Sequence, residues 1–184
     1  MVYPILIYGS PSLRKESEPV TPDYPELKQL IADMFETMRA SEGVGLAAPQ
    51  IGRNIRLIVA DASIYADEHP ELADFQRVFI NPEIVETSDE EIRLSEGCLS
   101  VPGIHEELYR PEKIVIKYFD ENFEPHEEAL DGFPARIAQH EADHLEGHFF
   151  TDRLQPLRRA LLSGKLSSMA KGNYKAAYKT RQAK

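Results

Sequence analysis

Several features are scarce in this sequence of 184 residues, and each scarcity excludes something. Tryptophan is absent, cysteine occurs once, and no apolar run approaches the roughly 18 residues that cross a bilayer. The first nine residues, MVYPILIYG, lack the basic segment that begins a secretory signal peptide. One cysteine excludes an internal disulfide, which fits a reducing compartment. We therefore predict a cytoplasmic protein without a membrane partner, folded as one domain over residues 1–184.

Acidic residues are also missing from the end of the chain. Residues 165–184 contain no Asp or Glu, although the net charge of the whole chain is −10. Their six bases are Lys165, Lys171, Lys175, Lys179, Arg181 and Lys184. The simpler interpretation is a solvated basic tail, and the alternative is a tail that contacts RNA. Few aromatic residues lie between these bases, so the pattern indicates RNA only weakly and predicts no DNA partner.

Hydrophobic periodicity predicts helices toward both ends and strands between them. Apolar residues recur every three or four positions over residues 25–39, and Asp23 with Glu26 resembles a capping box. A second helix is expected to open at residues 131–134 and to end at Gly147. Strands are predicted at residues 3–8, 55–60, 78–85, 91–94 and 113–119. This order predicts an α+β fold, with residues 62–76 as a polar surface insertion.

The second predicted helix contains the pattern H-E-x-x-H. His140 and His144 are four residues apart, so they share one helical face and could bind one divalent metal. Glu141 would then lie beside a water at that metal, which is the arrangement of a hydrolytic site. A five-residue pattern also arises by chance, so the interpretation depends on a third ligand.

The sequence limits the choice of a third ligand. A Glu downstream on another helix is excluded, because no acid follows Asp152, and the extended H-E-x-x-H-x-x-G-x-x-H pattern has Phe150 at its last position. His148 is expected at the surface, with ligation as a minor alternative. His69, His105 and His126 are expected to be solvated. Cys98 remains, and a Cys/His/His set accepts iron(II) or zinc.

Three further patterns occur in order along the chain: G-x-G-L-A-A-x-Q at residues 43–50 (GVGLAAPQ), E-G-C-L-S at residues 96–100 (EGCLS) and Q-H-E-x-D-H at residues 139–144 (QHEADH). These segments resemble the motifs of one family, the bacterial-type peptide deformylases. The three occur in the family's order, and the similarity extends from about residue 4 to residue 154. One such motif would be weak, whereas three in order are specific.

The resemblance implies an enzyme that removes the formyl group from the N-formylmethionine of new polypeptides and releases formate. It implies one divalent metal ion held by Cys98, His140 and His144, typically iron(II), with zinc, nickel or cobalt able to occupy the site. The family fold is α+β, with antiparallel sheets around a central metal-binding helix, an N-terminal amphipathic helix and a C-terminal helix. A basic C-terminal segment can contact the ribosome in this family.

The resemblance also implies roles for residues around the metal ligands. Water activated by the metal attacks the formyl carbon, and Glu141 acts as general base and then acid. The Gln50 side chain and the Leu99 backbone N–H stabilise the oxyanion, and the Gly45 carbonyl accepts the formyl N–H. The candidates for the walls around methionine are Gly43, Val44, Leu94 and Ile137.

Five further positions are interpreted as supports of the site. Asp143 is expected to orient a histidine or to bond nearby backbone, and Gln139 to support Cys98 or the start of the helix. Glu96 and Arg110 are expected to form an ion pair beside the cysteine. Arg136 either lines the mouth of the site or points to solvent.

Two other functions remain to be weighed against deformylation. A peptidase that cuts internal bonds would use the same water chemistry, but the sequence lacks its usual third ligands. A non-catalytic metal-binding or ribosome-associated module would not need Glu141 and Gln50.

Overall fold

Helices and antiparallel sheets are both present, as the sequence predicts. A computed structural model describes residues 1–182, in which three α-helices accompany nine strands. The helices are α1 (Leu27–Ala40), α2 (Gly132–Leu145) and α3 (Pro156–Ala170). The strands are β1 (Ile5–Leu6), β2 (Gly45–Ala47), β3 (Leu57–Asp61), β4 (Gln76–Thr87), β5 (Glu91–Cys98), β6 (Val101–Pro111), β7 (Lys113–Phe119), β8 (Pro125–Asp131) and β9 (Thr180–Arg181).

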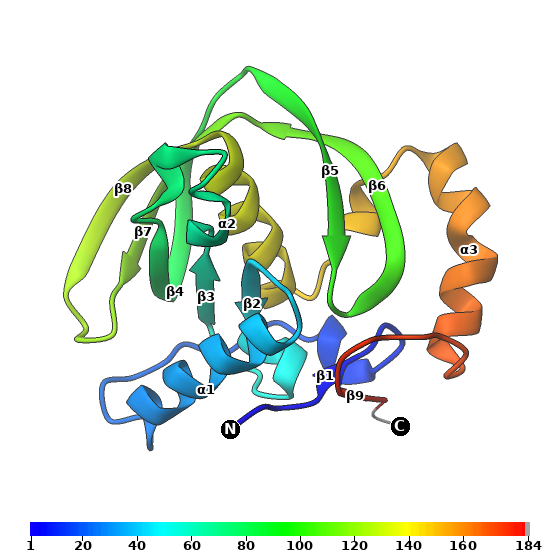
Figure 1. Ribbon diagram of the computed structural model, residues 1–184, viewed down its shortest axis with the longest axis horizontal. Coiled ribbons are helices and arrows are strands. Elements are labelled where there is room, and N and C mark those ends of the chain that lie inside the picture. Colours follow the sequence, from blue (N-terminus) through cyan, green and yellow to red (C-terminus); the bar gives the residue numbers. More distant parts are fainter. Residues whose placement is uncertain (183–184) are drawn as a thin grey trace.

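The strands form three sheets. Strands β2, β3, β4, β7 and β8 form a five-stranded antiparallel sheet in the order β2-β3-β4-β7-β8. A long hairpin pairs β5 with β6, and β1 pairs in parallel with β9. Figure 1 shows α2 between the five-stranded sheet and the hairpin, so residues of both can contact this helix. None of the helices in residues 1–182 has the length and hydropathy needed to cross a membrane.

The amphipathic helix α1 packs as predicted, but its start differs. Its apolar stripe is buried in the main core through Leu27, Leu30, Ile31, Met34 and Met38. The predicted capping box is wrong, because Glu26 has a left-handed backbone (φ 53°) and its side chain makes no capping hydrogen bond. Asp23 instead bonds Thr21, outside the helix. Burial of the stripe, and not a cap, therefore holds this helix in place.

Helix α2 ends where Gly147 was predicted to end it. The N–H of His148 donates to the carbonyl of Asp143 (2.8 Å) and that of Gly147 to the carbonyl of His144 (3.3 Å), the pair of bonds that defines a Schellman motif. Gly147 has φ 72°, and a Cβ there would lie 2.6 Å from the carbonyl oxygen of Arg14. Only glycine fits this position, so the end of the helix and the placement of its histidines are fixed together.

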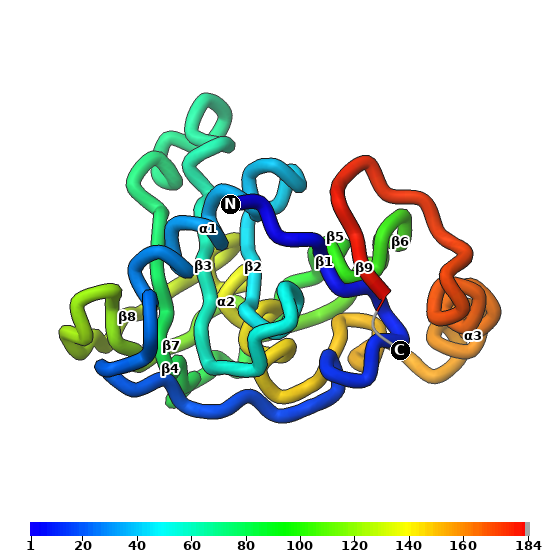
Figure 2. Tube along the Cα trace, turned by 90° about the horizontal axis from the view of Figure 1, so that it is seen from below, coloured from blue at the N-terminus to red at the C-terminus, as the bar shows by residue number. Residues whose placement is uncertain are grey.

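Within the described residues, the segment predicted to be a solvated basic tail is largely folded. Residues 165–170 belong to helix α3, so only residues 171–182 of the described chain lie beyond the helix. Residues 173–179 then return to the body, and β9 pairs with β1 through Ile5–Thr180 and Leu6–Arg181. Figure 2 shows this returning segment beside the N-terminal strand. Lys184 of the predicted tail lies outside the described residues.

The segment 62–76 lies mostly at the surface, as predicted, but it is attached to the core. It folds into two short 3₁₀ turns, Ser63–Tyr65 and Pro70–Leu72. Leu72 and Phe75 are buried in the core between the sheet and α2. Because the segment is mostly polar and acidic, its composition did not indicate that these two residues attach it to the sheet.

Candidate active site

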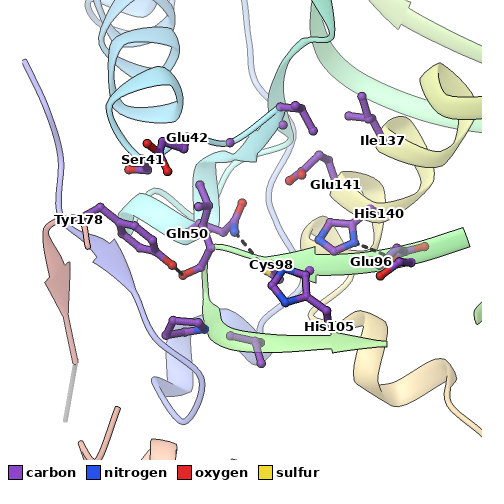
Figure 3. A pocket seen from close by; sticks show the side chains of 18 of the residues that line it. Ser41, Glu42, Gln50, Glu96, Cys98, His105, Ile137, His140, Glu141 and Tyr178 are labelled. Atoms are coloured by element: carbon purple, nitrogen blue, oxygen red, sulfur yellow. Dashed lines mark hydrogen bonds and ion pairs between the residues drawn. The ribbon is translucent and has the colours of Figure 1, made fainter. Parts of the chain in front are cut away.

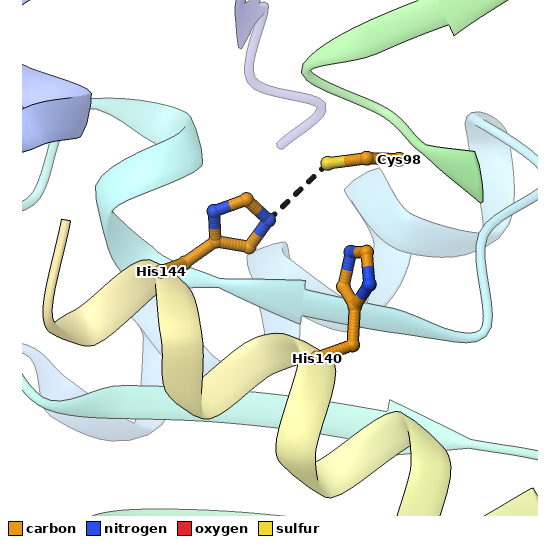
Figure 4. A group of neighbouring side chains, drawn as sticks. All are labelled: Cys98, His140 and His144. Atoms are coloured by element: carbon orange, nitrogen blue, oxygen red, sulfur yellow. Dashed lines mark hydrogen bonds between the residues drawn. The ribbon is translucent and has the colours of Figure 1, made fainter. Parts of the chain in front are cut away.

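The three predicted metal ligands meet where the hairpin approaches α2. Cys98 is the last residue of β5, and both histidines lie on the face of α2 that looks toward it (Figure 4). The Sγ atom of Cys98 is 3.2 Å from Nε2 of His144. Candidate ligand atoms of Cys98, His140 and His144 all lie within 4.8 Å of one another. Two elements that are distant in sequence thus bring one sulfur and two ring nitrogens to one point.

The charges around this point favour a cation. Nδ1 of His140 lies 2.7 Å from a carboxylate oxygen of Glu96, which leaves its Nε2 for the site. Burial alone raises the pKa of the Cys98 thiol, but His144 and His140 lower it to about 5. Burial disfavours the charged form of His140, yet its bonds to Cys98 and Glu96 raise its pKa. A half-buried thiolate stabilised by positive charge, together with two buried imidazoles, is a donor set that fits a divalent metal.

Glu96 is the residue that orients His140. Its two oxygens accept hydrogen bonds from Arg110 (2.6 and 2.9 Å), and one of them also accepts from Arg136 (2.7 Å). Burial raises the pKa of this carboxyl group, but the bonds from His140 and Arg110 hold it well below its usual range. The predicted Glu96–Arg110 ion pair is confirmed, and it is buried. The alternative that Arg136 points to solvent is wrong, because its side chain is 4% exposed.

Asp143 does not orient a histidine, whereas Gln139 follows one of its two predicted roles. Asp143 accepts bonds from Arg110 (2.8 Å) and Arg153 (2.7 Å), so it holds the arginine behind Glu96 and not a histidine ring. The Gln139 amide donates to the carbonyls of Pro111 and Ala135 and does not support Cys98. The bond to Ala135 agrees with the other predicted role, support of the first turn of α2.

Glu141 lies on the inner side of the pocket with a free oxygen. The side chain is buried, and its Oε2 has no hydrogen-bond partner within residues 1–182. Burial raises the pKa of this carboxyl group. A Cβ on Gly45 would lie 2.5 Å from the other carboxylate oxygen, so glycine is required for strand β2 to approach Glu141 this closely. An unpaired buried carboxylate of this kind is suited to exchanging protons with a ligand.

Gln50 faces the same space from the opposite side. It lies in a 3₁₀ turn, Ala48–Ile51, after β2. The backbone N–H of Ala47 donates to its side-chain oxygen (2.9 Å), which turns the NH₂ group toward Ser100 Oγ (3.2 Å) and Cys98 Sγ (3.6 Å). Figure 3 shows Gln50, His140 and Glu141 directed into one pocket. The Gln50 amide, the candidate metal ligands and the Glu141 carboxylate therefore face one common space.

The pocket has a volume of about 510 Å³ and contains most of the predicted substrate-binding residues. Those that line it are Gly43, Val44, Gly45, Gln50, Leu99 and Ile137. Leu94 does not line it, and lies in a neighbouring hollow with Leu72 and Ile92. Leu94 shares a face of β5 with Glu96, but it lies two residues farther from Cys98 along the strand, beyond the pocket.

Several residues of the pocket were not identified from the sequence. Tyr65 and Phe133 line it and contact each other edge to face, with ring centroids 5.6 Å apart. His105 is exposed, as predicted, yet its ring covers Gly97 at the pocket rim. The remaining wall of the pocket consists of residues 175–178, which lie near the C-terminal end of the chain. No spacing pattern links these residues to the motifs, because chain folding alone brings them together.

Three kinds of similarity agree with this geometry. Residues 2–160 match the Polypeptide deformylase family. Peptide deformylases of Christiangramia forsetii and Flavobacterium johnsoniae are 44% and 45% identical over 98% and 94% of this chain, and over 96% and 91% of their own.

Solved structures show the same arrangement of the chain. A peptide deformylase from Plasmodium falciparum superposes with a TM-score of 0.82 at 40% identity, over 91% of this chain and 95% of its own. One from Legionella pneumophila gives 0.80 at 40% identity, over 95% and 100%. With Cys98, His140 and His144 gathered beside Glu141 and similarity along nearly the whole length, this chain belongs to the polypeptide deformylase family, which are hydrolases.

Proposed function

We propose that this protein removes the formyl group from the N-formylmethionine that begins new polypeptides, releasing formate and a free amino terminus. The observation that carries the proposal is the arrangement of Cys98, His140 and His144 in one pocket with Glu141 and Gln50. The relatives that match nearly the whole chain are also peptide deformylases.

Cys98, His140 and His144 would hold one divalent cation, and we assign iron(II), with zinc, nickel and cobalt as ions that the same donors accept. Such a cation supplies Lewis acidity, which lowers the pKa of a water and polarises the formyl oxygen. Glu96 supports this role, because its bond to Nδ1 fixes the His140 ring with Nε2 toward the site.

Glu141 is assigned the proton transfers. Its buried carboxylate accepts a proton as the water oxygen bonds to the formyl carbon, and it returns the proton to the nitrogen as the C–N bond breaks. The raised pKa of this group brings its acid and base forms closer to neutral pH, where both steps must occur. The unpaired Oε2 gives the carboxylate an oxygen for this exchange.

Negative charge develops on the formyl oxygen during attack, so donors must face it. The Gln50 amide nitrogen and the Leu99 backbone N–H are assigned this task, and the Gly45 carbonyl accepts the substrate N–H. The bond from Ala47 to the Gln50 oxygen supports the assignment, because it directs the NH₂ group and not the oxygen into the pocket.

The walls of the pocket support an apolar first residue. Val44 and Ile137 line it near Glu141, and we assign them to the methionine side chain, with Gly43 leaving room beside Leu99. Leu94 lines the adjacent hollow and would contact only residues beyond methionine.

We treat the whole chain as one catalytic domain. Leu162, Leu166 and Met169 of α3 are buried in the main core, and residues 175–178 line the pocket, so the C-terminal part belongs to the same body. Contact between the ribosome and the exposed bases Lys165, Lys171 and Lys179 stays a prediction.

The proposed function is tested with three peptides: formyl-Met-Ala, Met-Ala and a longer unformylated peptide. We expect formate from the first and no cleavage of the other two. Glu141→Gln should lower turnover by about 10²–10⁴-fold, because general acid–base catalysis contributes about that much. Glu146→Gln, an exposed glutamate at the end of the same helix, is the control and should retain activity. Internal cleavage of the longer peptide, or full activity in Glu141→Gln, would contradict the assignment.

A further inference from the structure

The turn that carries Cys98 is held by hydrogen bonds from two tyrosines. Residues 98–101 join β5 to β6, and the carbonyls of Leu99 and Ser100 accept hydrogen bonds from other segments of the chain. The Tyr178 hydroxyl donates to the Leu99 carbonyl (2.7 Å), and the Tyr8 backbone N–H donates to the Ser100 carbonyl (2.8 Å). Consecutive carbonyls of the turn are thus fixed by two different parts of the chain.

Both holding residues come from the small parallel sheet β1–β9. Tyr8 lies two positions after β1, and Tyr178 lies two positions before β9. The two strands are joined by bonds from Ile5 N–H to Lys179 O (2.9 Å) and from Ile7 N–H to Arg181 O (3.2 Å). The two ends of the chain are therefore fastened to each other and then to the cysteine turn. Figure 3 shows Tyr178 reaching the turn from the side opposite α2.

The same turn also faces the pocket. The Ser100 N–H lies 3.4 Å from Cys98 Sγ, and the Gln50 amide donates to Ser100 Oγ. The Leu99 carbonyl and the Ser100 N–H belong to one peptide unit. A donor on the carbonyl polarises that unit and strengthens its N–H as a donor. The chain of contacts therefore runs from the Tyr178 hydroxyl through one peptide unit to the sulfur.

We propose that Tyr178 is a positioning residue of the hydrolytic site, which fixes the Leu99–Ser100 peptide unit and thereby the Cys98 sulfur and the Leu99 N–H. This inference rests on the proposed function, because the Leu99 N–H has a task only if an oxyanion forms there. It gives the segment after α3 a role inside the site, where the sequence indicated a solvated tail. Burial raises the pKa of Tyr178 to about 12, so its hydroxyl keeps its proton at neutral pH.

Tyr174 offers a matched control. Its hydroxyl bonds Thr180 Oγ1 (3.1 Å) within the same returning segment and does not reach the turn. Tyr178→Phe and Tyr174→Phe each remove one hydroxyl and keep the ring, so both variants should fold. We expect Tyr178→Phe to lower kcat by about three- to tenfold with little change in KM, the effect of losing one hydrogen bond that matters in the transition state. Tyr174→Phe should match the wild type.

A second measurement does not depend on activity. In zinc-loaded protein, amide hydrogen exchange at Leu99 and Ser100 should be faster in Tyr178→Phe than in wild type and Tyr174→Phe. If the wild type fails to release formate, the proposed function is wrong, yet the exchange rates still decide whether Tyr178 holds the turn. Exchange rates equal in all three proteins would overturn the inference. So would a Tyr178→Phe variant whose kcat and KM match those of Tyr174→Phe.

Discussion

The floor and the C-terminal wall of the pocket are built in opposite ways. We call the floor the charged cluster of Glu96, Arg110, Arg136 and Asp143, whose side chains are each 8% exposed or less and linked by ion pairs. Glu96 and Arg136 line the pocket, and Arg110 and Asp143 lie behind Glu96. The wall consists of residues 175–178, in which the first three are exposed and Tyr178 makes the hydrogen bond to Leu99.

The difference follows from what each region must hold. The floor carries the histidine that would bind metal, and a buried charge without a partner is costly, so every member of the floor must be satisfied at once. Its two carboxylates and two guanidinium groups balance each other, which keeps Glu96 ionised to orient His140. The wall borders substrate and solvent, where a lost contact is replaced by water. Changes at the centre should therefore have much larger effects than changes at the wall.

The largest effect is expected at the centre of the pocket, where we propose that Gln50 faces the oxyanion. Gln50→Ala removes the NH₂ group that faces the pocket, and we expect kcat for formyl-Met-Ala to fall by about 10²–10³-fold. Steady-state kinetics measure this loss. Gln155→Ala, an exposed glutamine at the start of α3, should leave kcat unchanged. A loss of less than about tenfold in Gln50→Ala would show that the backbone donor suffices.

A smaller effect is expected on metal affinity when the floor loses its central charge. Glu96→Gln keeps the shape of the side chain but weakens its bonds to His140 and Arg110, so zinc affinity should fall by about 10- to 100-fold. Competition with a chelator measures the dissociation constant.

Glu106 supplies the control for this change. It is also a buried glutamate bonded by an arginine, Arg158, but it lies on β6 and makes no bond to His140 or to the floor. Glu106→Gln should bind zinc as the wild type does. Equal zinc affinity in both variants would mean that the floor does not orient His140. Thermal unfolding of both variants identifies any loss that comes from destabilisation alone.

Sequence reasoning succeeded for features that are determined by short spacings between residues. His140 and His144 share a face because a helix repeats every 3.6 residues, and Gly147 ends that helix because only glycine fits against Arg14. It also anticipated the Glu96–Arg110 pair, which spans the two strands of the hairpin. These features depend on local geometry or on a pairing close in sequence.

The same reasoning failed where distant segments meet. Strands β2 and β9 are three and two residues long, too short for a periodicity to show, and β9 forms only because β1 offers a parallel edge. The sequence left Arg136 either at the mouth of the site or in solvent, because its partners, Glu96 and the carbonyls of Ile92 and Leu108, come from the hairpin. Composition cannot reveal such partners, and a buried arginine is recognised only after the fold supplies them.

The smallest effect is expected at Lys175, on the exposed part of the wall. Lys175→Gln removes a positive charge at the pocket rim, where water screens it, so KM for formyl-Met-Ala should change by no more than about two- to threefold and kcat should stay the same. Lys165→Gln, exposed on α3 and outside the pocket, is the matched control. Kinetics at low and high salt measure both, since a screened charge acts mainly at low ionic strength. A tenfold rise in KM that persists at high salt would instead place Lys175 in direct contact with the substrate. The Lys175 charge would then need a partner, as the charges of the floor do. The floor and the wall would no longer differ in this respect.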